Sequence, residues 1–135
     1  MSFSVTKCSN INCMTCSNLF CFSNFIFINN VQVFLNSNLT CKSTHAIYVI
    51  FCSSCSLFYV GKSQTSVNVR FNKHRSDLNS TQIDSLLPVT KHLKSCSNKH
   101  FSFSLIYQQL SFDNFDFCSA ENYFKLLLKP PLNVQ

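Results

Sequence analysis

The sequence contains very little glycine and glutamate. Gly61 and Glu121 are each the single residue of their type in 135 residues, although average usage predicts about nine glycines. Tryptophan is absent, and no apolar run approaches the ~18 residues that a membrane span requires. The strongest apolar runs, Phe25–Ile28 and Ala46–Cys52, have the length of strands. These absences exclude a membrane-spanning helix and make the positions of the one glycine and the one glutamate informative.

The N-terminus also lacks the basic region, continuous apolar region and small-residue cleavage site of a secretory signal. We therefore expect an intracellular protein that is not secreted. Nine cysteines in such a chain argue against a disulfide framework, because intracellular thiols are kept reduced and an odd number cannot pair completely. Metal-bound thiolates explain this cysteine content better.

Positive charge is concentrated in the middle of the chain. The net charge is +6, from 11 Lys and Arg against five acidic residues. Seven of the basic residues lie between positions 62 and 99, where the only acidic residues are Asp77 and Asp84. The seven are Lys62, Arg70, Lys73, Arg75, Lys91, Lys94 and Lys99. Such a segment suits a polyanion such as nucleic acid, and charge alone is equally compatible with an ordinary solvated face.

Two β-hairpins are predicted in the first half of the chain. Two β-prone runs, 25–28 and 31–35, flank an Asn-Asn pair that tolerates a tight turn. The runs 45–52 and 56–60 are joined by a short turn, and the second run ends at Gly61. The stretch before residue 25 is rich in Cys, Ser and Asn and is expected to form loops held by something other than a core.

Helices and one further strand are predicted in the second half. A helix over 67–79 has Thr65 or Ser66 as its N-cap and directs Val67, Phe71 and Leu78 toward the core. The later predictions are a short helix over 88–94, a strand over 101–110, and a helix over 118–128 that ends before Pro130-Pro131. The expected fold is α/β (α+β): a small mixed or antiparallel three-stranded sheet flanked by helices. A Cys-rich segment with a β-hairpin (1–44) precedes this domain (45–135).

A set of chemically active residues follows a recognisable order. Each has an ordinary explanation alone, since a strand tyrosine is usually core and an i,i+4 charged pair is usually a solvated stripe. In order they are Ala46-Ile47-Tyr48, Tyr59-Val60-Gly61, Arg70, His74, Glu121 and Leu132-Asn133. This order strongly resembles the GIY-YIG nuclease family over about residues 45–135. Ala46 replaces the glycine of the first tripeptide, which is a mild change at a position that contributes backbone and a small side chain.

The resemblance implies a metal-dependent endonuclease that hydrolyses DNA phosphodiester bonds. Glu121 would hold Mg²⁺ or another divalent cation, since a carboxylate with waters is ordinary Mg²⁺ coordination. Arg70 would neutralise the phosphate, and Tyr48 would activate water. Which tyrosine acts as the base stays open. A phenol has a pKa of ~10, so the base role requires cationic neighbours that lower it, and Arg70, His74 and the metal are the candidates. The remaining expected roles are orientation of the water or the phosphate by Tyr59, a proton relay by His74, and orientation of Glu121 or Tyr48 by a hydrogen bond from Asn133. Substrate binding is expected of Gly61, Lys62, Lys73 and Arg75.

The cysteines predict a structural zinc site. Cys8, Cys13, Cys16 and Cys41 supply four thiolates at suitable spacing. Cys52 and Cys55 form a second C-x₂-C pair and are alternate ligands, either in a mixed site or as small buried residues. The other cysteines and the histidines outside the catalytic set are expected to be structural, packing or surface residues. This group comprises Cys21, Cys96, Cys118, His45, His92 and His100.

The cysteine segment ahead of the nuclease-like core resembles the nuclease domain of Penelope-like retroelements. That resemblance implies a chain derived from a retroelement, a nuclear location, and a reverse transcriptase of the same element as a partner. The alternative is an inactive, zinc-containing module that binds nucleic acid. A zinc-stapled protein-interaction domain would explain the cysteines and would leave the order of Tyr, Arg, His and Glu as coincidence.

Overall fold

The computed structural model describes residues 2–52, 55, 57–78, 92, 101–110 and 116–133, and within 73–78 it describes the backbone alone. Its strands are β1 (Ser4–Val5), β2 (Phe22–Ser23), β3 (Phe25–Ile28), β4 (Val31–Phe34), β5 (Ala46–Cys52), β6 (Phe58–Ser63) and β7 (Phe101–Gln108). Its α-helices are α1 (Val67–Leu78) and α3 (Phe117–Leu128), and its 3₁₀ helices are η1 (Cys16–Asn18) and η2 (Pro131–Asn133). The three-stranded antiparallel sheet flanked by helices is confirmed.

The central sheet has the order β6-β5-β7, with β5 in the middle. The β5–β6 register runs from Ala46 opposite Ser63 to Phe51 opposite Phe58. The predicted end of the second strand at Gly61 is therefore wrong, because backbone pairing with β5 continues two residues further. Strand β7 pairs with the other side of β5, with an irregularity between Ile47 and Tyr48.

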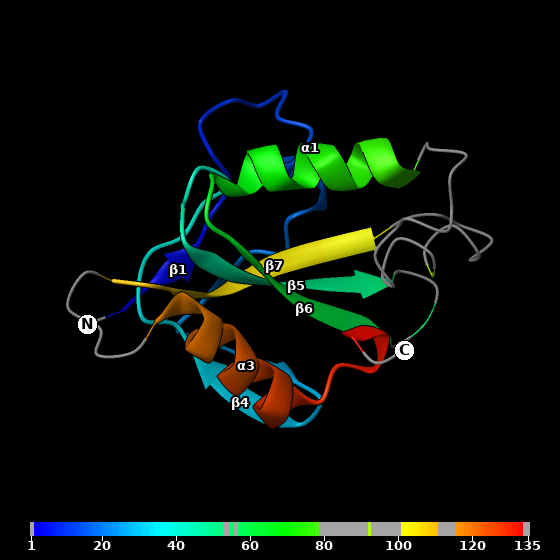
Figure 1. Ribbon diagram of the computed structural model, residues 1–135. Helices are drawn as coiled ribbons and strands as arrows, with labels where there is room; N and C mark the ends of the chain where they lie inside the picture. The colour runs from blue at the N-terminus through cyan, green and yellow to red at the C-terminus, as the bar shows by residue number, and fades with distance from the viewer. Residues whose placement is uncertain are drawn as a thin grey trace.

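The sheet is covered on both faces (Figure 1), because successive side chains of a strand point to opposite sides. Tyr48 and Ile50 of β5 lie in one core cluster, together with residues of α1 and of the N-terminal cysteine segment. Ile47 and Val49 lie in the other cluster, together with residues of α3 and of the β3–β4 hairpin. All four side chains are buried, so β5 is the centre of the fold.

The β3–β4 hairpin forms where the sequence predicts it. Asn29 and Asn30 form its turn with φ of 51° and 66°, the left-handed conformation that asparagine tolerates better than most residues. Ile28 and Val33 are its buried side chains and pack on the α3 face of the sheet. The hairpin therefore contributes to the core beneath the central sheet.

The N-terminal cysteine segment also packs against the sheet. Val5, Leu19 and Leu39 are buried in the cluster that contains Tyr48, and Leu19 forms an isolated bridge with Phe103 of β7. The expectation of loops held without a core is therefore wrong for this segment. The boundary between residues 44 and 45 stays a prediction.

Both long helices lie close to their predicted positions. Val67 and Phe71 of α1 are buried as expected, whereas the side chain of Leu78 lies outside the described atoms. Helix α3 begins one residue earlier than predicted, because the Asp116 carboxylate accepts the N–H of Ser119 and caps it. The predicted helix over 88–94 lies outside the described residues. No helix in the described parts of the chain is long and apolar enough to span a membrane.

Candidate active site

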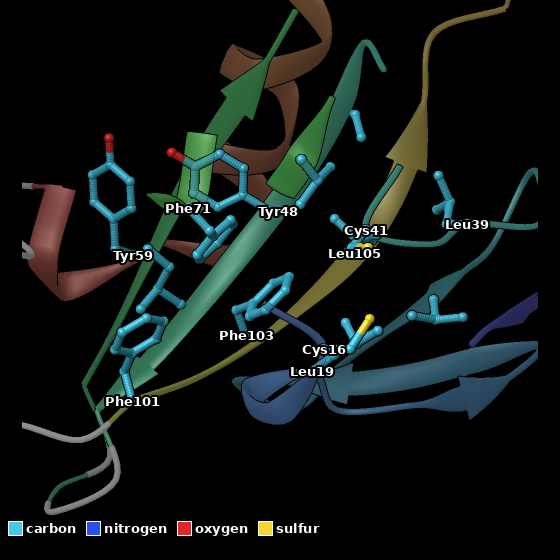
Figure 2. Close-up of a cluster of buried hydrophobic side chains, with 14 of the residues drawn as sticks. Cys16, Leu19, Leu39, Cys41, Tyr48, Tyr59, Phe71, Phe101, Phe103 and Leu105 are labelled. Atoms are coloured by element: carbon cyan, nitrogen blue, oxygen red, sulfur yellow. The ribbon is translucent and has the colours of Figure 1, made fainter. Parts of the chain in front are cut away.

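The two tyrosines of the motif lie on the same face of the sheet. Tyr48 of β5 is opposite Gly61 of β6, and Tyr59 is opposite Ile50, so all four residues face α1. The Tyr48 and Tyr59 ring centroids are 6.4 Å apart, and Figure 2 shows both hydroxyl groups turned to the same side. The strand pairing therefore brings together two phenols that are eleven residues apart in the sequence.

Gly61 leaves the space that the ring of Tyr48 occupies. A Cβ atom at position 61 would lie 2.6 Å from both the Cζ and the hydroxyl oxygen of Tyr48, and 2.9 Å from the ring of Tyr59. Real Cβ atoms essentially never approach other atoms so closely. The one glycine of the chain is required here for close approach rather than for an unusual φ angle.

Arg70 reaches the same place from α1. Its Nε donates a hydrogen bond of 3.3 Å to the Tyr48 hydroxyl oxygen. Phe71, the next residue, fixes the helix against the sheet by stacking on Phe103 with ring centroids 3.9 Å apart. A guanidinium that binds the Tyr48 oxygen through Nε has further N–H groups on the same rigid plane, suited to a phosphate.

Glu121 approaches from α3, on the other side of edge strand β6. It lines a cleft of about 350 Å³ together with Tyr59, Lys62, Ser63, Gln64, Thr65 and Arg70. The Lys125 ammonium lies 3.5 Å from its carboxylate, one helical turn away. A carboxylate in a polar, open cleft beside two cationic groups is suited to a hydrated divalent cation and a phosphodiester.

Burial opposes ionisation of both phenols. Desolvation raises the pKa of Tyr48 above its usual value, and the hydrogen bond and charge of Arg70 offset only part of that rise. Desolvation likewise raises the pKa of Tyr59, and the neighbouring Tyr48 adds to the effect. Arg70 is therefore the described side chain that favours a Tyr48 phenolate, as expected from the sequence, but it does not outweigh burial.

Lys62 lines the cleft, its role in substrate binding stays a prediction, and it has a partner that sequence reasoning missed. Its Nζ lies 2.7 Å from Sγ of Cys118 in the first turn of α3, and this hydrogen bond raises the pKa of Lys62. The contact joins residues 56 positions apart, so no local pattern could have indicated it. His74, Lys73 and Arg75 lie on α1 as predicted, and their side chains lie outside the described atoms.

Asn133 has a different role from the one expected. Its Oδ1 accepts the N–H of Val60, and its Nδ2 donates to the carbonyl of Val60, both at 2.8 Å. The sequence predicted hydrogen bonds to Glu121 or Tyr48, whereas the side chain instead extends the β-ladder at the edge of β6. Asn133 therefore positions the strand between Tyr59 and Gly61.

The N-terminal cysteines form the expected cluster. The Sγ atoms of Cys8, Cys13, Cys16 and Cys41 all lie within 4.8 Å of one another. The Sγ–Sγ distance is 3.8 Å for Cys13 and Cys41 and 3.7 Å for Cys8 and Cys16. A tetrahedral site with Zn–S bonds of ~2.3 Å requires sulfurs ~3.8 Å apart. The four thiols therefore have the spacing of a tetrahedral metal site.

The environment of these thiols differs from one to the next. A backbone N–H of Cys16 lowers the pKa of Cys13 to about 7, whereas burial raises the pKa of Cys16 and of Cys41. The N–H of Cys8 also donates to Sγ of Cys16 at 3.3 Å. Such N–H···S hydrogen bonds would stabilise thiolates on a bound metal ion.

The second cysteine pair, Cys52 and Cys55, lies beside a histidine. Cys52, Cys55 and His92 have ligand atoms within 4.8 Å of one another, and Nε2 of His92 lies 3.2 Å from Sγ of Cys55. The assignment of His92 as a packing or surface residue misses this contact. Of the described residues, these three form a group separate from the four-cysteine cluster, so a mixed site that combines the two sets is wrong.

Comparison with known protein families agrees with this arrangement. Residues 44–133, two thirds of the chain, match the family model described as the GIY-YIG catalytic domain. Searches of curated proteins and of solved structures found no match. GIY-YIG domains are nucleases that hydrolyse phosphodiester bonds with the aid of a divalent metal ion. The matched range contains Tyr59, Arg70 and Glu121, which line one cleft, and Tyr48, which Arg70 binds. The chain belongs to the GIY-YIG family of nucleases.

Proposed function

We propose that this protein is an endonuclease that nicks DNA and uses Mg²⁺ as its divalent ion. The observation that carries the proposal is that side chains from two helices, on opposite faces of the sheet, line one cleft at the edge of β6. Arg70 from α1 and Glu121 from α3 line one cleft with Tyr59, and Arg70 also binds Tyr48. Phosphodiester hydrolysis needs this combination of cation, carboxylate and proton-transfer groups in one place.

Each side chain has a distinct proposed role. Arg70 binds the phosphoryl oxygens and hydrogen-bonds the Tyr48 oxygen. In the base role Tyr48 first loses its own proton to solvent, which Arg70 and a bound metal ion favour, and the phenolate then takes a proton from the attacking water and returns to the phenol. Tyr59 orients that water or the phosphate, and Lys62, on the same strand β6, binds the phosphate. Glu121 holds Mg²⁺, which when bound neutralises charge on the phosphate and the leaving oxygen. A proton relay through His74 and substrate binding by Lys73 and Arg75 are further parts of the proposal.

We assign Zn²⁺ to the four-cysteine cluster. Four sulfur ligands at tetrahedral spacing favour Zn²⁺ over Mg²⁺, which prefers oxygen ligands. Two Sγ–Sγ distances of 3.7 and 3.8 Å support this choice. The test is metal analysis of protein purified without added zinc. About one equivalent of zinc is expected, and less than about half an equivalent contradicts a structural site.

We further propose that the chain derives from a retroelement, acts in the nucleus, and works beside a reverse transcriptase of the same element. The support is the order of motifs, with a cysteine triplet and Cys41 ahead of the nuclease core. Co-purification of the tagged protein with such a polymerase tests the origin and the partner, and imaging of the protein in cells tests the nuclear location.

A plasmid assay tests the nuclease function. Purified protein is incubated with supercoiled plasmid and Mg²⁺, with EDTA as the metal-free control. Wild type should give open circles, whereas Glu121→Gln, which keeps the shape of the side chain and removes its charge, should not. Equal nicking by both proteins contradicts the proposal, and tight DNA binding without nicking indicates an inactive binding module. A parallel incubation with RNA tests the choice of DNA.

A further inference from the structure

The N-terminus of α1 is capped by the backbone of the cysteine segment. The first N–H groups of a helix have no partner within the helix. Here the N–H of Val67 donates to the carbonyl of Ser43 at 3.0 Å, and the N–H of Asn68 donates to the carbonyl of Cys41 at 2.7 Å. Residues Thr40–Ser43, which we name the capping turn, thus replace the side-chain cap expected from Thr65 or Ser66.

The capping turn contains one of the four candidate zinc ligands. Cys41 is fully buried, and its Sγ lies 3.8 Å from Sγ of Cys13. The turn is closed by two hydrogen bonds, from the N–H of Thr40 to Oγ of Ser43 and from the N–H of Ser43 to the carbonyl of Thr40. A metal ion bound to the Cys41 sulfur therefore restrains Cys41, whose carbonyl accepts the hydrogen bond from the N–H of Asn68.

The capped helix carries Arg70 to the active site. Arg70 is two residues beyond Asn68 and donates to the Tyr48 hydroxyl at 3.3 Å. Phe71 packs against Tyr48 with ring centroids 5.0 Å apart, and Figure 2 shows Cys41 on the same side of the sheet as these rings. A chain of direct contacts thus runs from the cysteine cluster through α1 to Tyr48.

We propose that a metal ion in the four-cysteine cluster positions Arg70 for catalysis by fixing the capping turn. Cys41 is then a positioning residue as well as a ligand. Loss of the metal frees the capping turn, weakens the hydrogen bonds at the first turn of α1, and lets Arg70 leave Tyr48. This inference rests on the proposed nuclease function and on the proposed zinc site.

Amide hydrogen exchange of the full chain tests this coupling directly. NMR exchange rates are compared before and after the metal is removed by a chelator. Exchange at Val67 and Asn68 should accelerate at least about tenfold, while Val49 and Val60 in the central sheet keep their rates. Unchanged rates at Val67 and Asn68 overturn the inference. Equal acceleration in the sheet also overturns it, because the metal would then support only overall stability.

A matched pair of variants tests the same contact with the cluster intact. Ser43→Ala removes the hydroxyl that accepts from Thr40 and leaves all four cysteines in place. The control is Ser17→Ala, which removes the 2.6 Å hydrogen bond to the carbonyl of Met14 beside another ligand, Cys16. Only Ser43→Ala should accelerate exchange at Asn68 and lower kcat for nicking about tenfold, with KM little changed. Equal effects of the two variants overturn the inference.

The two readouts separate this inference from the proposed function. Amide exchange can be measured without nuclease activity. If exchange at Val67 and Asn68 accelerates as expected but the protein nicks no DNA, the result contradicts the nuclease proposal alone. Normal nicking by Ser43→Ala with fast exchange at Asn68 overturns the coupling alone. A chain that binds no metal at the cluster overturns the coupling together with the zinc site.

Discussion

The hydroxyl end of Tyr48 lies against the Cα of Gly61, where a Cβ atom would be only 2.6 Å away. Tyr48 is fully buried between the sheet and α1, so any displacement of its ring disturbs the core packing around it. The strand pairing that places the two residues opposite each other therefore depends on the absence of a side chain at position 61.

Gly61→Ala should destabilise the protein by about 1–3 kcal/mol, the usual cost of overpacking a core. It should also lower nicking activity, because Tyr48 must move away from Arg70. Urea denaturation measures the first effect and the plasmid assay the second. Combining Gly61→Ala with Tyr48→Phe removes one of the three clashing atoms, so the stability losses should be less than additive. Strict additivity contradicts a direct clash.

Arg70→Lys should reduce kcat for nicking by about 10²-fold or more, the range found for removal of one preorganised donor. Lysine keeps the positive charge but loses the planar fork and the Nε–H that binds Tyr48. Single-turnover nicking kinetics measure the effect, with the melting temperature as the check on folding. Activity within about twofold of wild type would show that charge alone is sufficient.

Lys125→Met should lower the Mg²⁺ concentration at half-maximal activity by about two- to fivefold. The Lys125 ammonium is 3.5 Å from the Glu121 carboxylate and competes with a cation, and a surface pair of this kind contributes up to ~1 kcal/mol. The matched control is Lys129→Met, at the C-terminal end of the same helix. An unchanged Mg²⁺ requirement for Lys125→Met, or an equal shift in both variants, contradicts the competition.

In the protein free of metal and DNA, Tyr48 and Tyr59 should stay protonated at a pH that ionises an exposed tyrosine. Their folded-state pKa values are raised by burial, so their contribution to stability is complete below the unfolded value of ~10 and declines as pH rises further. In a pH titration, absorbance at 295 nm should show a late phase of tyrosine ionisation that coincides with unfolding. Tyr48→Phe or Tyr59→Phe should reduce the amplitude of this phase. A late phase unaffected by both substitutions would refute this assignment.

Asn133→Ala should destabilise the protein by about 1–3 kcal/mol, because the buried N–H and carbonyl of Val60 lose their partners. Asn36 makes the same paired contact with the backbone of Gln108 at the opposite edge of the sheet. Asn36→Ala is therefore the matched control. Both variants should lose stability in denaturation, but only Asn133→Ala should also lower kcat. Equal kcat in the two variants argues against positioning of Tyr59 by Asn133.

The sequence by itself determined the secondary structure and the chemical character of the site. Alternating or continuous apolar residues define β5 and β7, the Asn29-Asn30 pair defines a turn, and the spacing of Val67 and Phe71 defines the inner face of α1. These are local properties, decided by residues within a few positions of one another. The order of the motif residues also indicated the family, and the family model that matches residues 44–133 confirms it.

Only the tertiary structure decided which distant groups meet. Asn133 binds Val60 across 73 positions, Lys62 meets Cys118 across 56, and His92 meets Cys55 across 37. The carbonyls of Cys41 and Ser43 cap α1 in place of a neighbouring side chain. Backbone carbonyls are the same at every position, and a side-chain amide can bind any strand edge that it reaches. Such partners are selected by how the elements pack around β5, which no short stretch of sequence encodes.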